Sequence, residues 1–243
     1  MANLNPSSGS SSPDDRLEPQ FDDIDLQRIF HSVVGAKLHI SELPQAAAVC
    51  KFSTTGIQHT ISEFERWIGS RDSPRAEHLL VLVKFNVFRA MVSNSDTLGY
   101  SLTTNCDDDA LSLFNSPTTY SFSSLPKALQ PTKLQREIPH HPWIDQLPFP
   151  AMRNNLLLAG DGYDDMELCG DLVGFFSAGS GCTGLVVWGE PWDADGWEIT
   201  EAFAKRWGWT LKGCDDVFKS TNLWRASRGE RGLQFDKLLQ TVK

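Results

Sequence analysis

Two adjacent histidines, His140 and His141, stand between two prolines, and the carboxylate of Asp145 follows shortly after them. Imidazole and carboxylate groups bind transition metals and carry out general acid–base chemistry. Side chains of adjacent residues on an extended chain point in opposite directions, so the two histidines are poorly placed to share one metal ion. The spacing therefore favours a histidine that fixes the local chain path over a metal ligand.

Other motifs have equally plain explanations. Residues 179–184 match the glycine pattern of dinucleotide sites, but that pattern needs a strand before it and a helix after it, and here the order is reversed. We interpret this segment as a flexible loop. The carboxylates at 107–109 and 164–167 could hold Mg²⁺, although negative charge at a helix start explains both runs. The sequence predicts no catalytic residue, no metal site and no cofactor.

Three arginines, Arg225, Arg228 and Arg231, recur at three-residue spacing in a net basic stretch, residues 201–243. Such a strip could bind nucleic acid, but it is also typical of a solvated helix face. The net charge of the whole chain is −9, which argues against a protein that mainly grips phosphate backbones. We therefore do not expect direct nucleic-acid binding, and we expect Asp193 or Glu198 to pair with Arg225 or Arg228.

Tryptophan is concentrated in the second half, where seven of the eight indoles lie at or beyond Trp143. Indoles are large and apolar, with one N–H donor, so we expect several to share a core and bond to carbonyls. One or two are expected to line a pocket or an interface. The candidate interaction or pocket residues are His140, His141, Trp143, Asp145, Trp188, Trp192, Trp197, Trp224, Arg225 and Arg228.

The composition is that of an ordinary globular protein, with 40% hydrophobic and 22% charged residues in 243. The five cysteines are scattered without a Cys-x-x-Cys pair, which predicts reduced thiols in the nucleus or cytoplasm. Neither a secretory signal nor a membrane span is indicated.

The hydrophobic pattern predicts a mainly α fold, one compact helical domain over 29–243 with at most a minor β element. Residues 1–28 are rich in Ser, Pro and Asp and predict a disordered acidic tail. Residues 78–92 are apolar nearly all round, as in a central helix. Residues 99–138 predict a long loop with a short helix over 109–114.

In the second half, Pro150 and Gly160 bracket one predicted helix, and Asp164 begins another that runs toward Val173. Residues 185–188 are β-like. The cap spacing at 195–198, followed by apolar residues every four positions, predicts a helix through Trp207. Ser220 or Thr221 is expected to cap the last conspicuous helix.

Several motifs together resemble a fungal domain of unknown function that accompanies basic-leucine-zipper (bZIP) transcription regulators. The resemblance spans about residues 76–232 and rests on these segments: the Pro-His-His-Pro-Trp-Ile-Asp run at 139–145, residues 184–193, Gly196-Trp197-Glu198, Trp207-Gly208-Trp209 and Trp224-Arg225. The chain lacks the basic region and the zipper, so direct DNA reading is not implied.

The resemblance implies a regulator-related module that acts through protein contacts, with bZIP regulators among its partners, in fungal secondary metabolism or stress regulation. An alternative is a small-molecule-binding protein or unusual enzyme of a secondary-metabolite pathway. A deep cavity lined by tryptophan, with His140, Asp145 or Glu198 converging on it, would mark that alternative.

Overall fold

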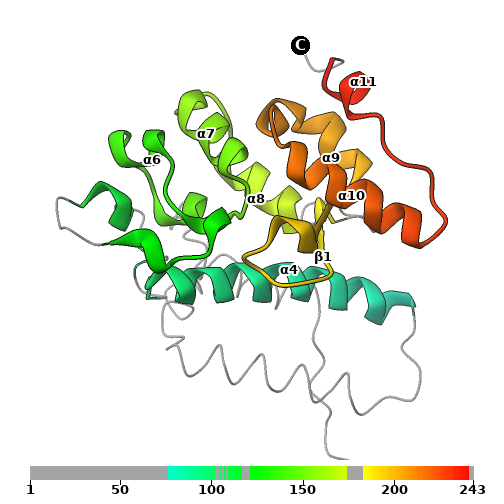
Figure 1. Cartoon of the computed structure of the whole chain (residues 1–243), viewed down its shortest axis with the longest axis horizontal. Helices are drawn as coiled ribbons and strands as arrows, with labels where there is room; N and C mark the ends of the chain where they lie inside the picture. Colours follow the sequence, from blue (N-terminus) through cyan, green and yellow to red (C-terminus); the bar gives the residue numbers. More distant parts are fainter. Residues whose placement is uncertain are drawn as a thin grey trace, which may run out of the picture.

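The computed structural model describes residues 76–101, 104, 107, 109–116, 121–173 and 183–240. The tail at 1–28 and the glycine pattern before residue 183 lie outside these residues. The described part is mainly helical, with one two-stranded sheet (Figure 1). Its elements are α4 (Ala76–Leu98), η1 (Leu113–Asn115), η2 (Phe122–Ser124), η3 (Lys127–Leu129), α6 (Lys133–Glu137), η4 (Pro142–Gln146), α7 (Pro150–Ala159), α8 (Asp165–Val173), β1 (Leu185–Val187), η5 (Ala194–Gly196), β2 (Trp197–Ile199), α9 (Glu201–Arg206), η6 (Gly208–Leu211), α10 (Asp215–Ser227) and α11 (Phe235–Gln240), where η marks a 3₁₀ turn.

Helix α4 is a long element along the bottom of the view in Figure 1, and the other labelled helices lie above it. Its residues Val87, Phe88 and Met91 are almost fully buried against the rest of the core. The helix ends where Gly99 adopts a φ of 83°, which costs glycine little because it has no Cβ. The predicted central helix is confirmed, and it continues six residues beyond Val92.

Helices α7 and α8 have the ends that their sequences predict. Pro150 occupies the first turn of α7, and Gly160 closes the helix with a φ of 53°. The Asp164 carboxylate accepts the backbone N–H of Glu167 at 2.9 Å, which satisfies one free donor at the start of α8. The carboxylates at 164–167 therefore include a helix cap.

Strands β1 and β2 pair antiparallel, with Leu185 opposite Ile199 and Val187 opposite Trp197. The predicted helix from 195 through Trp207 is therefore wrong in its first part. Residues 197–199 are fully extended and buried, and the side chain of Thr200 caps the shorter helix α9 that follows. Pairing with β1 outweighs the weak local preference for helix here.

Helix α10 begins at Asp215, five residues before the expected cap. Ser220 and Thr221 instead lie in the middle of the helix, where both are buried. The Ser220 hydroxyl donates to the carbonyl of Trp197 at 2.5 Å, and the Thr221 hydroxyl accepts the N–H of Ile199 at 2.9 Å. These hydroxyls join α10 to β2 rather than starting a helix. Helix α11 was not predicted.

The predicted long loop contains ordered structure. Thr132 and Gln135 form a reciprocal capping box that begins helix α6. Residues 109–114 do not form the expected helix, because only a 3₁₀ turn at 113–115 occurs there, capped by the Ser112 hydroxyl. A second small apolar cluster holds this region on the end of α4, and its buried members are Leu98, Tyr100, Phe114 and Leu129.

The main core joins α4 to the helices and the sheet above it. Three tryptophans contribute, Trp143, Trp197 and Trp207, each no more than 6% exposed. No helix in the described ranges combines the length and apolarity needed to cross a membrane.

Candidate functional site

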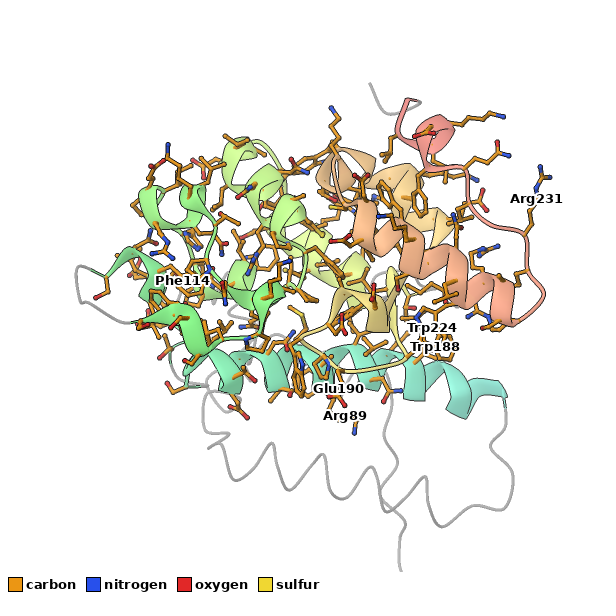
Figure 2. The ribbon with its side chains drawn as sticks, viewed as in Figure 1. Arg89, Phe114, Trp188, Glu190, Trp224 and Arg231 are labelled. Atoms are coloured by element: carbon orange, nitrogen blue, oxygen red, sulfur yellow. The ribbon has the colours of Figure 1, made fainter. Side chains whose placement is uncertain are left out.

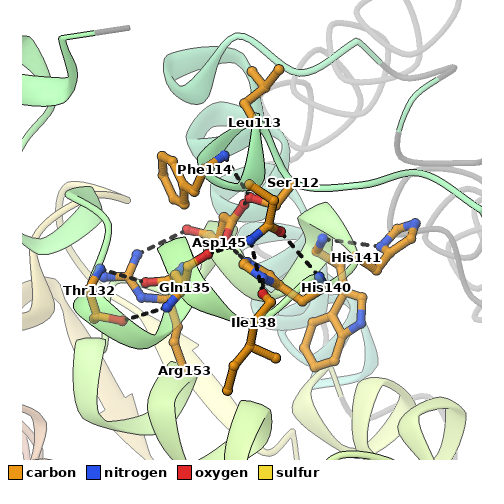
Figure 3. A network of polar contacts seen from close by, with 12 residues as sticks. Ser112, Leu113, Phe114, Thr132, Gln135, Ile138, His140, His141, Asp145 and Arg153 are labelled. Atoms are coloured by element: carbon orange, nitrogen blue, oxygen red, sulfur yellow. Dashed lines mark hydrogen bonds and ion pairs between the residues drawn. The ribbon is translucent and has the colours of Figure 1, made fainter. Parts of the chain in front are cut away.

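The carboxylate of Asp145 is the centre of a buried polar network (Figure 3). One oxygen accepts the hydroxyls of Tyr100 at 2.5 Å and Ser112 at 2.6 Å. The other accepts the amide of Gln135 at 2.6 Å and faces Nε2 of His140 at 2.7 Å. Four donors on one fully buried carboxylate fill its acceptor capacity. Burial and the negative charge of Asp145 together raise the pKa of Tyr100, so its hydroxyl stays protonated.

His140 has an acceptor at each ring nitrogen. Its Nδ1 lies 2.7 Å from the carbonyl oxygen of Ile138, and its Nε2 faces Asp145. Because a carbonyl oxygen can only accept a hydrogen bond, Nδ1 of His140 is the donor to Ile138. His141 lies on the other side of the chain, where its Nδ1 accepts the N–H of Trp143 at 3.3 Å. The two histidines diverge, as their adjacency predicts.

Arg153 from helix α7 closes the network from below. Its guanidinium is fully buried and donates to the backbone carbonyls of Ala128 at 2.9 Å and Gln130 at 3.0 Å. Burial lowers the pKa of Arg153 to about 10, while the charge of Asp145 opposes that shift. Arg153 thus joins helix α7 to η3, in the segment that the sequence predicts as a loop.

The network contains a serine, a histidine and an aspartate, but not in the arrangement of a hydrolase. In a Ser-His-Asp site the histidine lies between the other two and takes the serine proton. Here the Ser112 hydroxyl donates directly to Asp145, and the Ser112 backbone N–H donates to the His140 carbonyl. The arrangement has no activated nucleophile, and it joins η1, α6 and η4 into one rigid unit.

A second polar cluster lies at the surface, between the sheet and helix α10 (Figure 2). The rings of Trp188 and Trp224 stack with centroids 5.7 Å apart and 25° between their planes. The guanidinium of Arg228 lies 5.1 Å from the Trp188 centroid and bonds both oxygens of Glu198, at 2.9 and 2.7 Å. The Trp188 indole also donates to Glu198 at 2.8 Å. We call these four residues the Trp188 cluster.

Arg225, also from the arginine strip, is paired as well. Arg225 lies 3.2 Å from Glu230, and its Nε donates to the carbonyl of Arg231 at 2.8 Å. Arg228 contacts Glu230 in addition to Glu198, and these hydrogen bonds raise the pKa of Arg228. The carboxylates offset the charge that a phosphate backbone would require. The expected pairing of Glu198 with Arg228 is confirmed.

The connection between β1 and β2 presents a further exposed indole, Trp192. The chain turns from Glu190 to Asp193 with a backbone hydrogen bond of 3.1 Å between them, and Pro191 occupies the second position, which it favours in β-turns. The Pro191 carbonyl accepts two buried donors, Nδ2 of Asn94 at 2.8 Å and the indole of Trp197 at 3.0 Å. The turn is therefore fixed to the core.

The structure separates the candidate residues into two groups. His140 and Asp145 lie in the buried network, with Trp143 in the core beside it and His141 at its edge. The Trp188 cluster unites Trp188 just after β1, Glu198 of β2, Trp224 of α10 and Arg228 at the end of α10, and Trp192 lies on the adjoining turn. Sequence reasoning missed five residues that build these sites, Asn94, Tyr100, Ser112, Gln135 and Arg153; only the Thr-x-x-Gln capping spacing at 132–135 signals one of them.

A small open pocket of about 210 Å³ lies elsewhere, lined by residues that include Asp171, Thr183 and Arg206. Its arginine bonds Asp171 at 2.6 Å and also contacts Glu167. No tryptophan lines it, and His140, Asp145 and Glu198 are all absent from its wall. This pocket is therefore not the tryptophan-lined cavity that would mark a small-molecule site.

Residues 109–217 match one protein family model. That family is described as a domain of unknown function, DUF3425. The match is narrower than the resemblance over 76–232, and it includes Asp145, Trp188 and Glu198 but ends before Trp224 and Arg228. No curated protein and no solved structure matches the chain.

Proposed function

We propose that this protein is a regulator-related module that acts through protein contacts made by the Trp188 cluster and Trp192. The proposed setting is the nucleus or cytoplasm of a fungus, with bZIP regulators among the partners, in secondary metabolism or stress regulation. The setting rests on the motifs that resemble a bZIP-associated domain, and DUF3425 itself carries no assigned activity.

The exposure of two indoles is the observation that carries the proposal. Trp188 is 45% exposed and Trp192 36% exposed, whereas Trp143, Trp197 and Trp207 are buried. Tryptophan is enriched at the energetic centres of protein interfaces, because one large ring buries much area at little entropic cost. The buried network offers no competing site, since the Asp145 carboxylate at its centre already bonds to four protein side chains.

A tethering assay tests the proposal. The whole chain is fused to an unrelated DNA-binding domain upstream of a reporter in a fungal host. We expect the fusion to change reporter output, and we expect Trp188→Ala combined with Trp192→Ala to remove most of that change. Binding loss of about 2 kcal/mol or more is typical when a central interface tryptophan is removed.

The matched control replaces two exposed leucines elsewhere, Leu111→Ala and Leu158→Ala, which are 62% and 67% exposed. This pair removes apolar surface of a similar kind without touching the Trp188 cluster, so output should stay at the wild-type level. Immunoblots and nuclear imaging verify equal amounts of each fusion. The proposal is contradicted if the wild-type fusion does not change reporter output, or if the tryptophan and leucine variants give the same output.

A further inference from the structure

The turn that carries Trp192 is acidic, whereas the neighbouring Trp188 cluster contains an arginine. Residues 188–198 contain four carboxylates and no lysine or arginine. Glu198 is buried and bonded to Arg228, but Glu190, Asp193 and Asp195 are exposed. Glu190 and Asp193 occupy the two ends of the turn, so an acidic residue precedes and another follows the Pro191-Trp192 pair along the chain; one oxygen of Asp193 also accepts the backbone N–H of Asp195 at 3.0 Å. An exposed aromatic ring on an acidic turn is complementary to a cation.

The neighbouring Trp188 cluster shows how this chain binds a guanidinium. Arg228 lies over the face of Trp188 while Glu198 bonds its two terminal nitrogens. Ring face and carboxylate act together on one planar cation, the combination that favours arginine over lysine. Trp192 with Glu190 and Asp193 repeats the same residue types on the exposed side of the turn.

The turn is also held in place before any partner arrives. Buried Asn94 and Trp197 both donate to the Pro191 carbonyl. A Cβ added at Gly196 would lie 3.0 Å from the Glu190 carbonyl oxygen, so the two arms of the connection pack closely. Little conformational freedom remains to be lost on binding, which strengthens association for a given contact area.

We propose that the turn at 190–193 binds an arginine-containing basic segment of a protein partner, with Trp192 stacking on the guanidinium and Glu190, Asp193 and Asp195 pairing with its charges. This inference rests on the proposed function and adds the chemistry of the partner. Two arginines near the Trp188 cluster, Arg225 and Arg228, are paired with Glu230 and Glu198, so carboxylates offset the charge that would repel a basic segment.

The test uses the full chain and a synthetic peptide that alternates arginine with serine. The matched peptide carries glutamine in place of each arginine. Isothermal titration calorimetry should show saturable binding of the basic peptide only, weakening as salt rises. In Glu190→Gln/Asp193→Asn/Asp195→Asn, we expect affinity to fall about tenfold, equivalent to about 1.4 kcal/mol.

A net charge of −9 could attract any basic peptide, so the control must match the charge. Glu137→Gln/Asp161→Asn/Asp236→Asn removes three exposed carboxylates from α6, the end of α7 and α11. Both triple variants change the net charge by +3, from −9 to −6. The control should bind within about twofold of wild type, because exposed charges beyond a Debye length are screened.

Trp192→Ala gives a second readout, and it should weaken the arginine peptide without altering near-ultraviolet signatures of the buried indoles. Equal binding of the arginine and glutamine peptides, or equal losses in both triple variants, overturns the inference. If the tethered reporter still depends on Trp188 and Trp192 in that case, the proposed function stands with an apolar partner instead. If the tethered chain does not change reporter output but the turn still binds the arginine peptide, the proposed function is wrong and the binding chemistry of the turn stands.

Discussion

The Asp145 network and the Trp188 cluster are built from similar parts and differ in where their free surfaces point. In each, one carboxylate accepts several hydrogen-bond donors. In the network every participating residue is at most 8% exposed, and the Asp145 carboxylate bonds to other buried side chains. In the cluster, Glu198 is buried, but the Trp188 ring remains 45% exposed.

This difference separates a structural role from the binding role that we propose. A carboxylate with four buried donors has no capacity left for a substrate, and its cost of desolvation is offset only while all partners remain. An indole that is fixed by its N–H and remains partly exposed keeps apolar area for another molecule. Asn94 links the two regions, since its amide donates both to Gln146 beside the network and to Pro191 in the turn.

The largest expected effect is in the buried network. Asp145→Ala leaves the donors of Tyr100, Ser112, Gln135 and His140 without their shared acceptor. Because these groups are buried, we expect the free energy of unfolding to fall by about 3–5 kcal/mol. Urea denaturation followed by circular dichroism measures the loss.

The exposed aspartate Asp161 provides the control for this experiment. Asp161→Ala should change the free energy of unfolding by less than about 0.5 kcal/mol. A loss below about 1 kcal/mol for Asp145→Ala would show that the network contributes little to the fold. The structural role assigned to the Asp145 network would then be wrong.

An intermediate effect is expected at Asn94, where one side chain serves both regions. Asn94→Ala removes the bonds to the carbonyls of Gln146 and Pro191, although Trp197 still donates to the latter. We expect a loss of about 2 kcal/mol. Hydrogen exchange should rise in peptides that cover the turn at 190–193, because one of its two anchors is gone.

Thr97→Ala on the same helix is the comparison variant. Among the described residues, the Thr97 hydroxyl has its hydrogen bond to the carbonyl of Ser93 one turn earlier, at 2.8 Å. Its loss should leave exchange in the turn unchanged. Equal exchange in wild type and Asn94→Ala would refute the role of Asn94 as the anchor.

The smallest effect is expected at the exposed rim of the Trp188 cluster. Arg228, through its hydrogen bond, lowers the pKa of Glu230 below its ordinary value of 4.5. A carboxyl with a lowered folded-state pKa stabilises the fold above its unfolded pKa and loses that contribution as pH falls through the folded value. Glu230→Gln should therefore unfold at slightly lower temperature than wild type at neutral pH only.

Thermal unfolding of both proteins at neutral pH and well below pH 4.5 measures this difference. High salt should shrink the difference at neutral pH, because the pair is exposed. A difference that persists at acid pH would mean that Glu230 acts through packing and not through its charge.

The helix boundaries that were predicted well depend on neighbouring residues. Gly160 ends α7 and Asp164 caps α8, because a backbone conformation and a local hydrogen bond suffice for each. The pairing of Glu198 with Arg228 was also expected, from opposite charges on a tryptophan-rich segment. Its geometry, with the guanidinium over Trp188, could not be expected, because it depends on how β2 meets α10.

The failures occur where distant segments meet. Residues 197–199 have a helix-like pattern, yet strand β1 supplies hydrogen-bond partners that make the extended form more stable. Ser220 has the composition of a cap, yet the carbonyl of Trp197 gives its hydroxyl a partner in the middle of a helix. Local preferences are worth a fraction of a kcal/mol per residue, so tertiary contacts outweigh them.

The sequence by itself determined the mainly helical class, the central helix and the concentration of indoles in the second half, because periodicity and composition are local properties. It did not determine which indoles stay exposed or that Asp145 collects four donors. Burial is decided by which elements pack over a residue, and the donors Tyr100 and Ser112 lie 45 and 33 positions from Asp145 along the chain. Only the tertiary structure could separate the buried network from the exposed tryptophan cluster.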